Sequence, residues 1–270
     1  MTAHRHNKLL GQNFLTCEWV LSDLAKAAEL TASDTVLEIG PGTGVLTRFL
    51  AARVKKVVAV EKDRQLSSSL SEAFAQEKIS NVEIITGDIL KLLPHLIADY
   101  SLPTLGYKLV SNIPYYLTSR LIRTLLELEK KPEVIVLTIQ KEVAERIVAR
   151  PPDMNILALS VQAYGTPEIV ADVPASCFNP QPKVDSAILK ITHISENFFT
   201  KHHIASKDFF SLVKAGFSSR RKMLTNNLRS FASKKELVQA LHSIGHSPSA
   251  RAQELSLQEW IKIIVNLRLL

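Results

Sequence analysis

A short run of polar and aromatic residues has the composition to act on an amino group: Ser111-Asn112-Ile113-Pro114-Tyr115-Tyr116, which follows a predicted strand at Lys108–Ser111. The Asn112 side-chain oxygen and the Pro114 backbone carbonyl can accept both N–H bonds of an adenine amine, and proline holds that carbonyl in place. Such acceptors favour a pyramidal nitrogen and turn its lone pair toward a sulfonium methyl group. Tyr115 offers a face for a flipped base. The alternative is a proline turn with aromatics in the core, but the position at a strand end favours catalysis.

A glycine-rich loop, Gly40-Pro41-Gly42-Thr43-Gly44, follows the predicted strand Thr35–Ile39. Glycines at the end of a first strand let a ligand approach the backbone closely. The G-x-G-x-x-G spacing of a dinucleotide site is not met, because Val45 and Thr47 stand at the two places where a third glycine would fall. The loop therefore indicates a ligand site and counts against a nicotinamide dinucleotide.

Two acidic residues follow the next two predicted strands. Glu61 ends the second strand, where a carboxylate can accept hydrogen bonds from both hydroxyls of a ribose, although NAD sites use an acid there too. Asp88 follows the third strand and can accept a hydrogen bond from an adenine amino group; taken alone, it is better explained as a helix N-cap or turn residue. The glycine loop and both acids, in this order, together favour a nucleoside site.

The elements that must position these residues follow an α/β pattern. Short β-branched runs alternate with segments of helical periodicity through the first two-thirds of the chain, which predicts a parallel sheet flanked by helices. The predicted strands are Thr35–Ile39, Lys56–Glu61, Val82–Thr86, Lys108–Ser111, Pro132–Gln140, Pro167–Val173 and Val184–Thr192. The predicted helices between them are Val45–Arg53, Arg64–Ala75, Ser119–Leu128, Lys141–Ala149 and Met154–Tyr164. The loop Pro174–Lys183 is too short for a crossover helix, so the last two strands should be antiparallel neighbours.

From about Ile194 the strand-like runs stop, which predicts a small helical domain. Its expected helices are Ser206–Gly216, Arg221–Phe231, Lys235–Ser243 and Leu257–Arg268. We therefore expect a catalytic domain at residues 1–193 and a helical RNA-binding domain at residues 194–270. Between Phe209 and Lys235 there are seven Lys or Arg and no acid, within a chain of net charge +7. This concentration indicates a polyanionic partner, although charge alone also fits a basic soluble protein.

Composition narrows the class of protein further. The two cysteines, Cys17 and Cys177, show neither CxxC spacing nor a neighbouring histidine cluster, so we expect no zinc site and no disulfide framework. No apolar stretch has the length of a signal peptide or the roughly 20 residues that span a bilayer. We expect a soluble, cytoplasmic protein that uses no metal and binds no membrane.

Five motifs together carry a family resemblance that covers nearly the whole chain. The motifs are Gly11-Gln12-Asn13-Phe14-Leu15, Glu38-Ile39-Gly40-Pro41-Gly42-Thr43-Gly44, Asn112-Ile113-Pro114-Tyr115, Phe178-Asn179-Pro180-Gln181-Pro182-Lys183-Val184-Asp185-Ser186 and Phe217-Ser218-Ser219-Arg220-Arg221-Lys222. In this order the sequence resembles the rRNA adenine N6,N6-dimethyltransferases of the KsgA/RsmA group, which are related to the Erm methyltransferases. The resemblance implies a Rossmann-like fold and S-adenosylmethionine as cosubstrate.

The resemblance also implies roles for individual residues. The cofactor-binding set is Asn13, Leu15, Gly40, Gly42, Glu61, Asp88 and Asn112. The catalytic set is Asn112, Pro114, Tyr115 and Phe178, with Phe178 stacking on the target base, although by sequence alone it would more often be a core residue. Their positive charge, rather than the resemblance, indicates that Lys183, Arg220, Arg221 and Lys222 bind RNA phosphates, although a charge run is usually a solvated surface. The last three of these residues open a predicted helix. Tyr116 and Gln181 depart from residues common in the family.

The implied substrate is a pair of adjacent adenosines in a hairpin loop near the 3′ end of small-subunit rRNA, within an immature 30S particle, and the protein is expected to act as a monomer. Two alternatives remain open: an Erm-like enzyme that methylates large-subunit rRNA, and a non-catalytic ribosome-assembly factor with the same fold. The intact motif at residues 112–115 counts against the second. A nicotinamide oxidoreductase is disfavoured by Val45 and by the lack of a proton donor in that motif.

Overall fold

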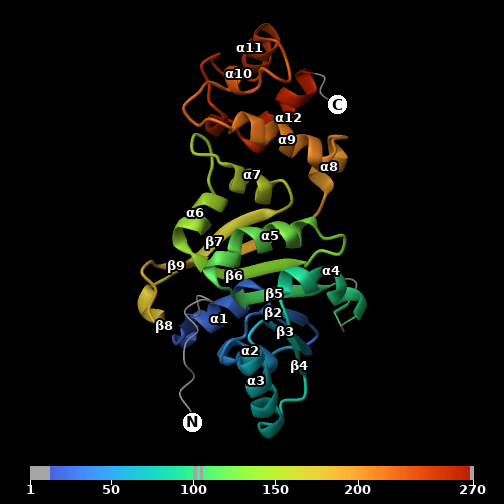
Figure 1. The fold of residues 1–270 in the computed structure, drawn as a ribbon, viewed down its shortest axis with the longest axis vertical. Coiled ribbons are helices and arrows are strands. Elements are labelled where there is room, and N and C mark those ends of the chain that lie inside the picture. The colour runs from blue at the N-terminus through green and yellow to red at the C-terminus, as the bar shows by residue number, and fades with distance from the viewer. Residues whose placement is uncertain (1–12, 100–101, 104–105, 268–270) are drawn as a thin grey trace. The chain divides into compact units, whose positions relative to one another are not determined.

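The computed structural model describes residues 13–99, 102, 103 and 106–267 (Figure 1). The chain divides into two compact units, one formed by Met1–Ala144 with Thr166–Ile194 and the other by Glu145–Gly165 with Ser195–Leu270. No helix within the described ranges is both long enough and apolar enough to cross a membrane.

The first unit contains a seven-stranded sheet with the order β4-β3-β2-β5-β6-β9-β7. Its strands are β2 (Thr35–Ile39), β3 (Lys56–Glu61), β4 (Val82–Thr86), β5 (Tyr107–Asn112), β6 (Val134–Gln140), β7 (Thr166–Val173) and β9 (Ser186–Thr192). The first five pair in parallel, whereas β9 pairs antiparallel with both β6 and β7. The predicted α/β fold with one antiparallel strand is therefore confirmed.

Both faces of the sheet carry apolar residues that are buried. On one face, Val36, Val57, Val110 and Val136 belong to a core cluster that also includes Leu24 of a helix. The helices of this unit are α1 (Glu18–Ala27), α2 (Val45–Ala51), α3 (Arg64–Gln76), α4 (Ile89–Asp99) and α5 (Thr118–Glu127), with α6 (Lys141–Ile147) at the boundary. Because helices cover parallel strands, these strands read as continuous apolar runs rather than as alternating ones.

Strand order places the carboxyl ends of β2 and β5 next to each other at the centre of the sheet. The chain runs outward from β2 through β3 to β4 and then returns to β5 on the other side of β2. Ligands of open α/β sheets bind at such a reversal, outside the carboxyl ends of the strands. The predicted cofactor and catalytic motifs both follow strands that end at this position.

A second, two-stranded sheet joins the N-terminal segment to a distant loop. Strand β1 (Phe14–Leu15) pairs antiparallel with β8 (Phe178–Asn179), which follows the 3-10 turn η3 (Ala175–Cys177). The pairing brings the Cα atoms of Cys17 and Cys177 to 5.1 Å, and the two sulfurs form a disulfide. The expectation of no disulfide was wrong because 160 residues separate the cysteines in sequence, so their spacing gives no signal. In a reducing compartment the two sulfurs would be neighbouring thiols.

The second unit is helical. It contains α7 (Ile156–Gln162), α8 (Asn197–Lys201), α9 (Ser206–Gly216), α10 (Leu224–Asn227), α11 (Lys234–Ser243), the 3-10 turn η4 (Ala252–Glu254) and α12 (Leu257–Asn266). Residues 145–165 group with this unit, whereas the sequence analysis assigned them to the first domain. They do so because α7 contacts α9 and the Met154 amide donates to the Gln253 carbonyl at 3.0 Å.

Replacing Gly216 by alanine should destabilise the second unit. A Cβ on Gly216, at the end of α9, would overlap the ring of Trp260 and lie 3.0 Å from Leu224. Trp260 is fully buried, so we expect the overlap to outweigh the helix propensity gained and to cost about 2 kcal/mol. Urea denaturation followed by tryptophan fluorescence measures the loss. Ser211→Ala, exposed on the same helix, is the control, and equal stability of the two variants would contradict the prediction.

Candidate active site

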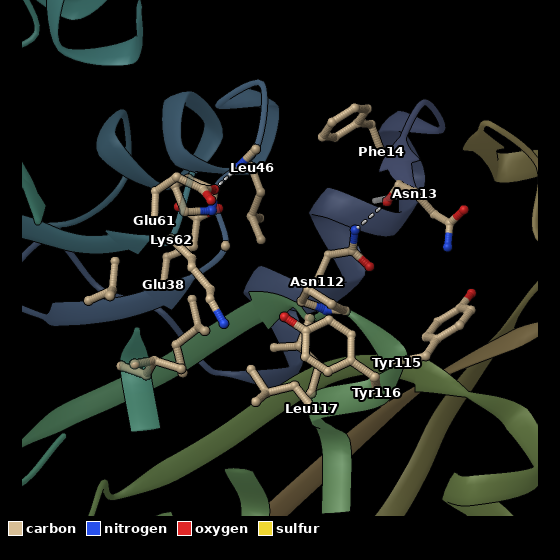
Figure 2. Close-up of a pocket in the computed structure, with 18 of the residues that line it drawn as sticks. Asn13, Phe14, Glu38, Leu46, Glu61, Lys62, Asn112, Tyr115, Tyr116 and Leu117 are labelled. Atoms are coloured by element: carbon tan, nitrogen blue, oxygen red, sulfur yellow. Dashed lines mark hydrogen bonds between the residues drawn. The ribbon is translucent and has the colours of Figure 1, made fainter. Parts of the chain in front are cut away.

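The carboxyl ends of β2, β3, β4 and β5 surround one pocket, and the N-terminal segment at residues 13–15 forms another part of its wall (Figure 2). All residues predicted to bind the cofactor line this pocket: Asn13, Leu15, Gly40, Gly42, Glu61, Asp88 and Asn112. Gly11 and Gln12 of the N-terminal motif lie outside the described residues. The structure thus brings together side chains that are up to 99 residues apart.

The loop after β2 forms a wall made of backbone. Gly40, Gly42 and Gly44 have φ angles of 68°, 58° and 78°, in the left-handed region that other residues avoid. A Cβ on Gly42 would lie 2.5 Å from Cε1 of Phe14. Glycine at this position therefore leaves room for the ring of Phe14, which lines the same pocket.

Glu61 is held at the end of β3 by backbone amides. Its Oε2 accepts from the Gly42 amide at 3.1 Å and its Oε1 from the Asp63 amide at 2.8 Å. Burial raises the pKa of Glu61, and the two amides oppose that rise. Each carboxylate oxygen keeps a lone pair free, so the side chain can accept hydrogen bonds from two neighbouring hydroxyls.

Asp88 serves both interpretations made from the sequence. Its Oδ1 accepts from the Leu90 amide at 3.1 Å, as an N-cap of α4 does, and the side chain also lines the pocket. Its Oδ2 accepts from Lys62 Nζ at 3.0 Å, and this hydrogen bond is the main reason that the pKa of Asp88 is lowered. The carboxylate is therefore an ionised acceptor at the far end of the pocket. Sequence reasoning missed Lys62, whose only signal is its position next to Glu61.

Glu38 is a second residue that sequence reasoning did not assign. It lines the pocket from β2, is fully buried, and its Oε2 has no hydrogen-bond partner in the part of the chain that is described. Burial raises the pKa of Glu38 to about 8, and the nearby Glu61 adds to the rise. The carboxyl is therefore neutral at pH 7. An acid inside the otherwise apolar run Thr35–Ile39 was the available signal.

Asn112 is oriented by a single hydrogen bond. Its Nδ2 donates to the backbone carbonyl of Asn13 at 3.0 Å. Because only the NH₂ group can donate to a carbonyl, this contact identifies which end of the amide is nitrogen. Figure 2 shows the side-chain oxygen on the other side, pointing away from Asn13. That oxygen is thus presented as an acceptor within the pocket.

The rest of the motif is fixed by its own contacts. The Pro114 carbonyl accepts from the Leu117 amide at 3.0 Å, which sets its direction and leaves its second lone pair available. The Tyr115 hydroxyl hydrogen-bonds with Ser186 Oγ at 2.7 Å, and burial raises the pKa of Tyr115. Tyr115 therefore stays a neutral ring held at one edge of the pocket.

Two predicted residues from the long motif lie elsewhere. Phe178 is buried in the core cluster, where β8 pairs it with Leu15, and it is not among the residues that line the pocket. Its stacking role stays a prediction. Lys183 is exposed on the loop that follows β8 and does not line the pocket either.

The basic cluster Arg220, Arg221 and Lys222 is exposed in the second unit. The prediction that these residues open a helix was wrong, because they lie in a turn and α10 begins only at Leu224. The Asn227 side chain donates to the carbonyls of Gly216 and Ser219, and the Lys222 amide donates to Ser219. These contacts close a turn where helix had been expected.

Residues 3–268 match the model of the family described as ribosomal RNA adenine dimethylase. This chain belongs to that family. It is therefore a methyltransferase, as the pocket and its motif had predicted.

Relatives of this adenine dimethylase support the assignment. It is 44% identical over 258 residues to the ribosomal RNA small subunit methyltransferase A of Dehalococcoides mccartyi, covering 95% of this chain and 86% of the relative. It is 39% identical over 267 residues to the protein of the same name from a Nostoc species, covering 96% and 97% of the two chains.

Solved structures resemble this adenine dimethylase over nearly its full length. A dimethyladenosine transferase from Plasmodium falciparum matches with a TM-score of 0.78 and 27% identity, over 94% of this chain and 97% of that one. The 23S rRNA methyltransferase ErmE matches with a TM-score of 0.75 and 26% identity, over 95% and 100%. The fold is therefore shared with a dimethyladenosine transferase and with a 23S rRNA methyltransferase.

The neutral Glu38 predicts a dependence of stability on pH. The folded state keeps a proton on this carboxyl up to about pH 8, whereas the unfolded chain loses it near the ordinary value of 4.5. The wild-type protein should therefore lose stability as pH rises through this window, relative to Glu38→Gln, which does not titrate. We expect the free energy of unfolding of Glu38→Gln, relative to that of wild type, to be higher at pH 8.5 than at pH 5 by on the order of a few kcal/mol.

Thermal unfolding of both proteins at the two pH values measures the difference. Glu142→Gln, an exposed carboxyl on α6, is the matched control and should change stability by less than about 0.5 kcal/mol at either pH. A difference between wild type and Glu38→Gln that does not grow with pH would show that Glu38 is ionised in the folded protein.

Proposed function

We propose that this protein transfers methyl groups from S-adenosylmethionine to N6 of two adjacent adenosines in a hairpin loop near the 3′ end of small-subunit rRNA. The observation that carries the proposal is the Asn112 amide, whose nitrogen is bound by the Asn13 carbonyl and whose oxygen is left for a substrate amine. The family match and the names of the relatives support the choice of adenine and of the small subunit.

The pocket fits S-adenosylmethionine by the chemistry of its donors and acceptors. Glu61 can accept from the two ribose hydroxyls, and Asp88 can accept from the adenine amine. The three glycines of the loop have no side chain, so they permit a close approach for the rest of the molecule. When bound, the cosubstrate supplies a methyl group activated by a positively charged sulfur.

The protein's part in the reaction is to align a weak nucleophile. The adenine amine donates one N–H to Asn112 Oδ1 and the other to the Pro114 carbonyl, which draws its lone pair out of conjugation with the ring. That lone pair forms the N–C bond as the C–S bond breaks, and the nitrogen then releases one proton to water. Tyr115 supports the base by stacking. No side chain forms a covalent intermediate, so the rate enhancement comes from orientation and hydrogen bonding.

Two alternatives make different predictions. An Erm-like enzyme would methylate large-subunit rRNA, and ErmE shares the fold at 26% identity. The small subunit is favoured because relatives named for it match at 39% to 44%. A non-catalytic assembly factor would not need the Asn13–Asn112 hydrogen bond. This bond orients the Asn112 side chain, which has no evident structural role apart from the site.

The proposed setting is the cytoplasm, with a monomeric enzyme acting on immature 30S particles. Phosphate contacts by Lys183, Arg220, Arg221 and Lys222 would provide affinity without reading sequence. Among the described residues, none of these four side chains takes part in a salt bridge. They are therefore available to a polyanion.

The direct test is incubation of the protein with labelled S-adenosylmethionine in two parallel reactions, one with 30S particles that lack the modification and one with unmodified large-subunit rRNA, followed by mapping of the methylated bases. We expect two neighbouring dimethyladenosines near the 3′ end of the small-subunit rRNA. Label found only in large-subunit rRNA would replace this proposal with the Erm-like one.

Asn112→Ala should remove methyl transfer while leaving the pocket able to bind cosubstrate. Loss of one hydrogen-bonding group that acts in the transition state lowers turnover by roughly 100-fold or more. Single-turnover rates and equilibrium dialysis with S-adenosylmethionine separate the two effects. Asn266→Ala, in which the asparagine is exposed on α12, is the control, and turnover of Asn112→Ala equal to the control would refute the assigned role.

The double variant Arg221→Glu with Lys222→Glu should weaken binding to 30S particles and leave the affinity for S-adenosylmethionine unchanged. Each lost phosphate contact lowers the slope of log K against log salt by about 1. The control is Lys207→Glu with Lys262→Glu, which makes the same change of charge at two other exposed sites of the second unit. Equal weakening by both double variants would mean that net charge, rather than this cluster, supplies the affinity.

A further inference from the structure

Two side chains at the rim of the pocket have no part in the alignment of the amine. Tyr116 is 59% exposed, and Arg120 is exposed as well. Both line the same pocket as Asn112. In Figure 2 the ring of Tyr116 lies across the front of the pocket, between Asn112 and Lys62.

Local structure explains why these two side chains lie together. The 3-10 turn η2 (Tyr115–Leu117) runs directly into α5 (Thr118–Glu127), and residues four apart lie on the same face of a helix. The side chains on either side of Tyr116 are held within the protein: Tyr115 hydrogen-bonds with Ser186, and Leu117 is buried. The ring of Tyr116 is therefore left at the surface by a turn whose other side chains are anchored.

Arg120 differs from the next arginine on the same helix. Arg123 Nε pairs with Glu127 at 2.8 Å, one helical turn further on. Arg120 has Tyr116 and Thr124 at the corresponding positions, and no described carboxylate lies within ion-pair distance of it. Within the described residues its guanidinium therefore has no carboxylate partner, and it lies at the mouth of a pocket proposed to receive part of a polyanion.

We propose that Tyr116 and Arg120 bind the nucleotide adjacent to the target adenosine, Tyr116 by stacking on its base and Arg120 by contacting the phosphate that joins the two. This proposal rests on the proposed function, in which the substrate is a pair of neighbouring adenosines. When one base enters the pocket, its neighbour lies at the mouth, where an exposed aromatic ring and a free guanidinium recognise an unpaired nucleotide.

The chemistry of the pair sets what each residue contributes. Stacking on a tyrosine ring tolerates any purine, because it uses the face of the base rather than its edge. A guanidinium can donate two parallel hydrogen bonds to one phosphate. Together they hold the strand on the side of the flipped base where its neighbour lies. They are positioning residues, because neither touches the reacting nitrogen or methyl group.

The test compares four variants of the full-length protein on unmodified 30S particles. Tyr116→Ala should raise the KM for particles by about 10-fold, and Tyr116→Phe, which keeps the ring, should restore the wild-type value. Arg120→Ala should raise the KM by a similar factor, whereas Arg123→Ala, which removes an arginine already paired on the same helix, should not. The dissociation constant for S-adenosylmethionine should be unchanged in all four.

A second measurement isolates the stacking contact. Particles are prepared in which one of the two adenosines is replaced by uridine, and methylation of the remaining adenosine is followed. The wild-type protein should lose efficiency on this substrate, because a pyrimidine offers a smaller stacking face. Tyr116→Ala, which lacks the stacking ring, should methylate the substituted and the unsubstituted particles with the same efficiency. If Tyr116→Ala and wild type lose efficiency equally, Tyr116 does not contact the neighbouring base.

The outcomes separate this inference from the proposed function. If the wild-type protein methylates the particles but Tyr116→Ala and Arg120→Ala match Arg123→Ala, the inference is wrong and the function stands. If the wild-type protein transfers no label to small-subunit rRNA, the proposed function itself fails. Loss of cosubstrate affinity in Tyr116→Ala would assign the ring to the cofactor instead and overturn the inference.

Discussion

The hydrogen bond from the Asn112 amide to the Asn13 carbonyl is the constraint on which the proposed chemistry depends. An amide has one donor end and one acceptor end, so a partner that can only accept determines which end faces the pocket. Asn112 ends β5 in the middle of the sheet, and Asn13 precedes β1, which is held by its pairing with β8. The orientation of one side chain thus relies on the main sheet and on the small sheet beside it.

Burial determines the charge of the acids in the pocket. Glu38 is enclosed in β2 and stays neutral near pH 7, whereas Asp88 at the other end keeps its charge because Lys62 donates to it. Glu61 lies between these extremes, with burial raising its pKa and backbone amides lowering it. A neutral Glu38 avoids placing a buried negative charge beside Glu61, while the ionised Asp88 accepts hydrogen bonds from N–H and O–H groups.

The sequence predicted the sheet well, because parallel strands covered on both faces read as β-branched runs and the residues at their ends carry the motifs. It failed where contacts join distant parts of the chain. The β1–β8 pairing and the disulfide connect residues about 160 apart, and Lys62 gains its partner Asp88 only through the packing of β3 beside β4. In place of the helix expected at Arg221–Phe231, the structure has only the short helix α10. The Asn227 side chain hydrogen-bonds with carbonyls of the turn that precedes this helix. Phe178 was assigned to the site by resemblance, and the structure buries it in the core.

The most direct test of the account is a crystal structure of the protein with S-adenosylhomocysteine and a short RNA that contains the two adenosines. The account predicts that Asn112 Nδ2 still donates to the Asn13 carbonyl, while Asn112 Oδ1 and the Pro114 carbonyl both lie within hydrogen-bonding distance, about 3 Å, of the target N6. A complex in which the base is seated in the pocket but the Asn112 side chain has rotated away from its amine would contradict the account.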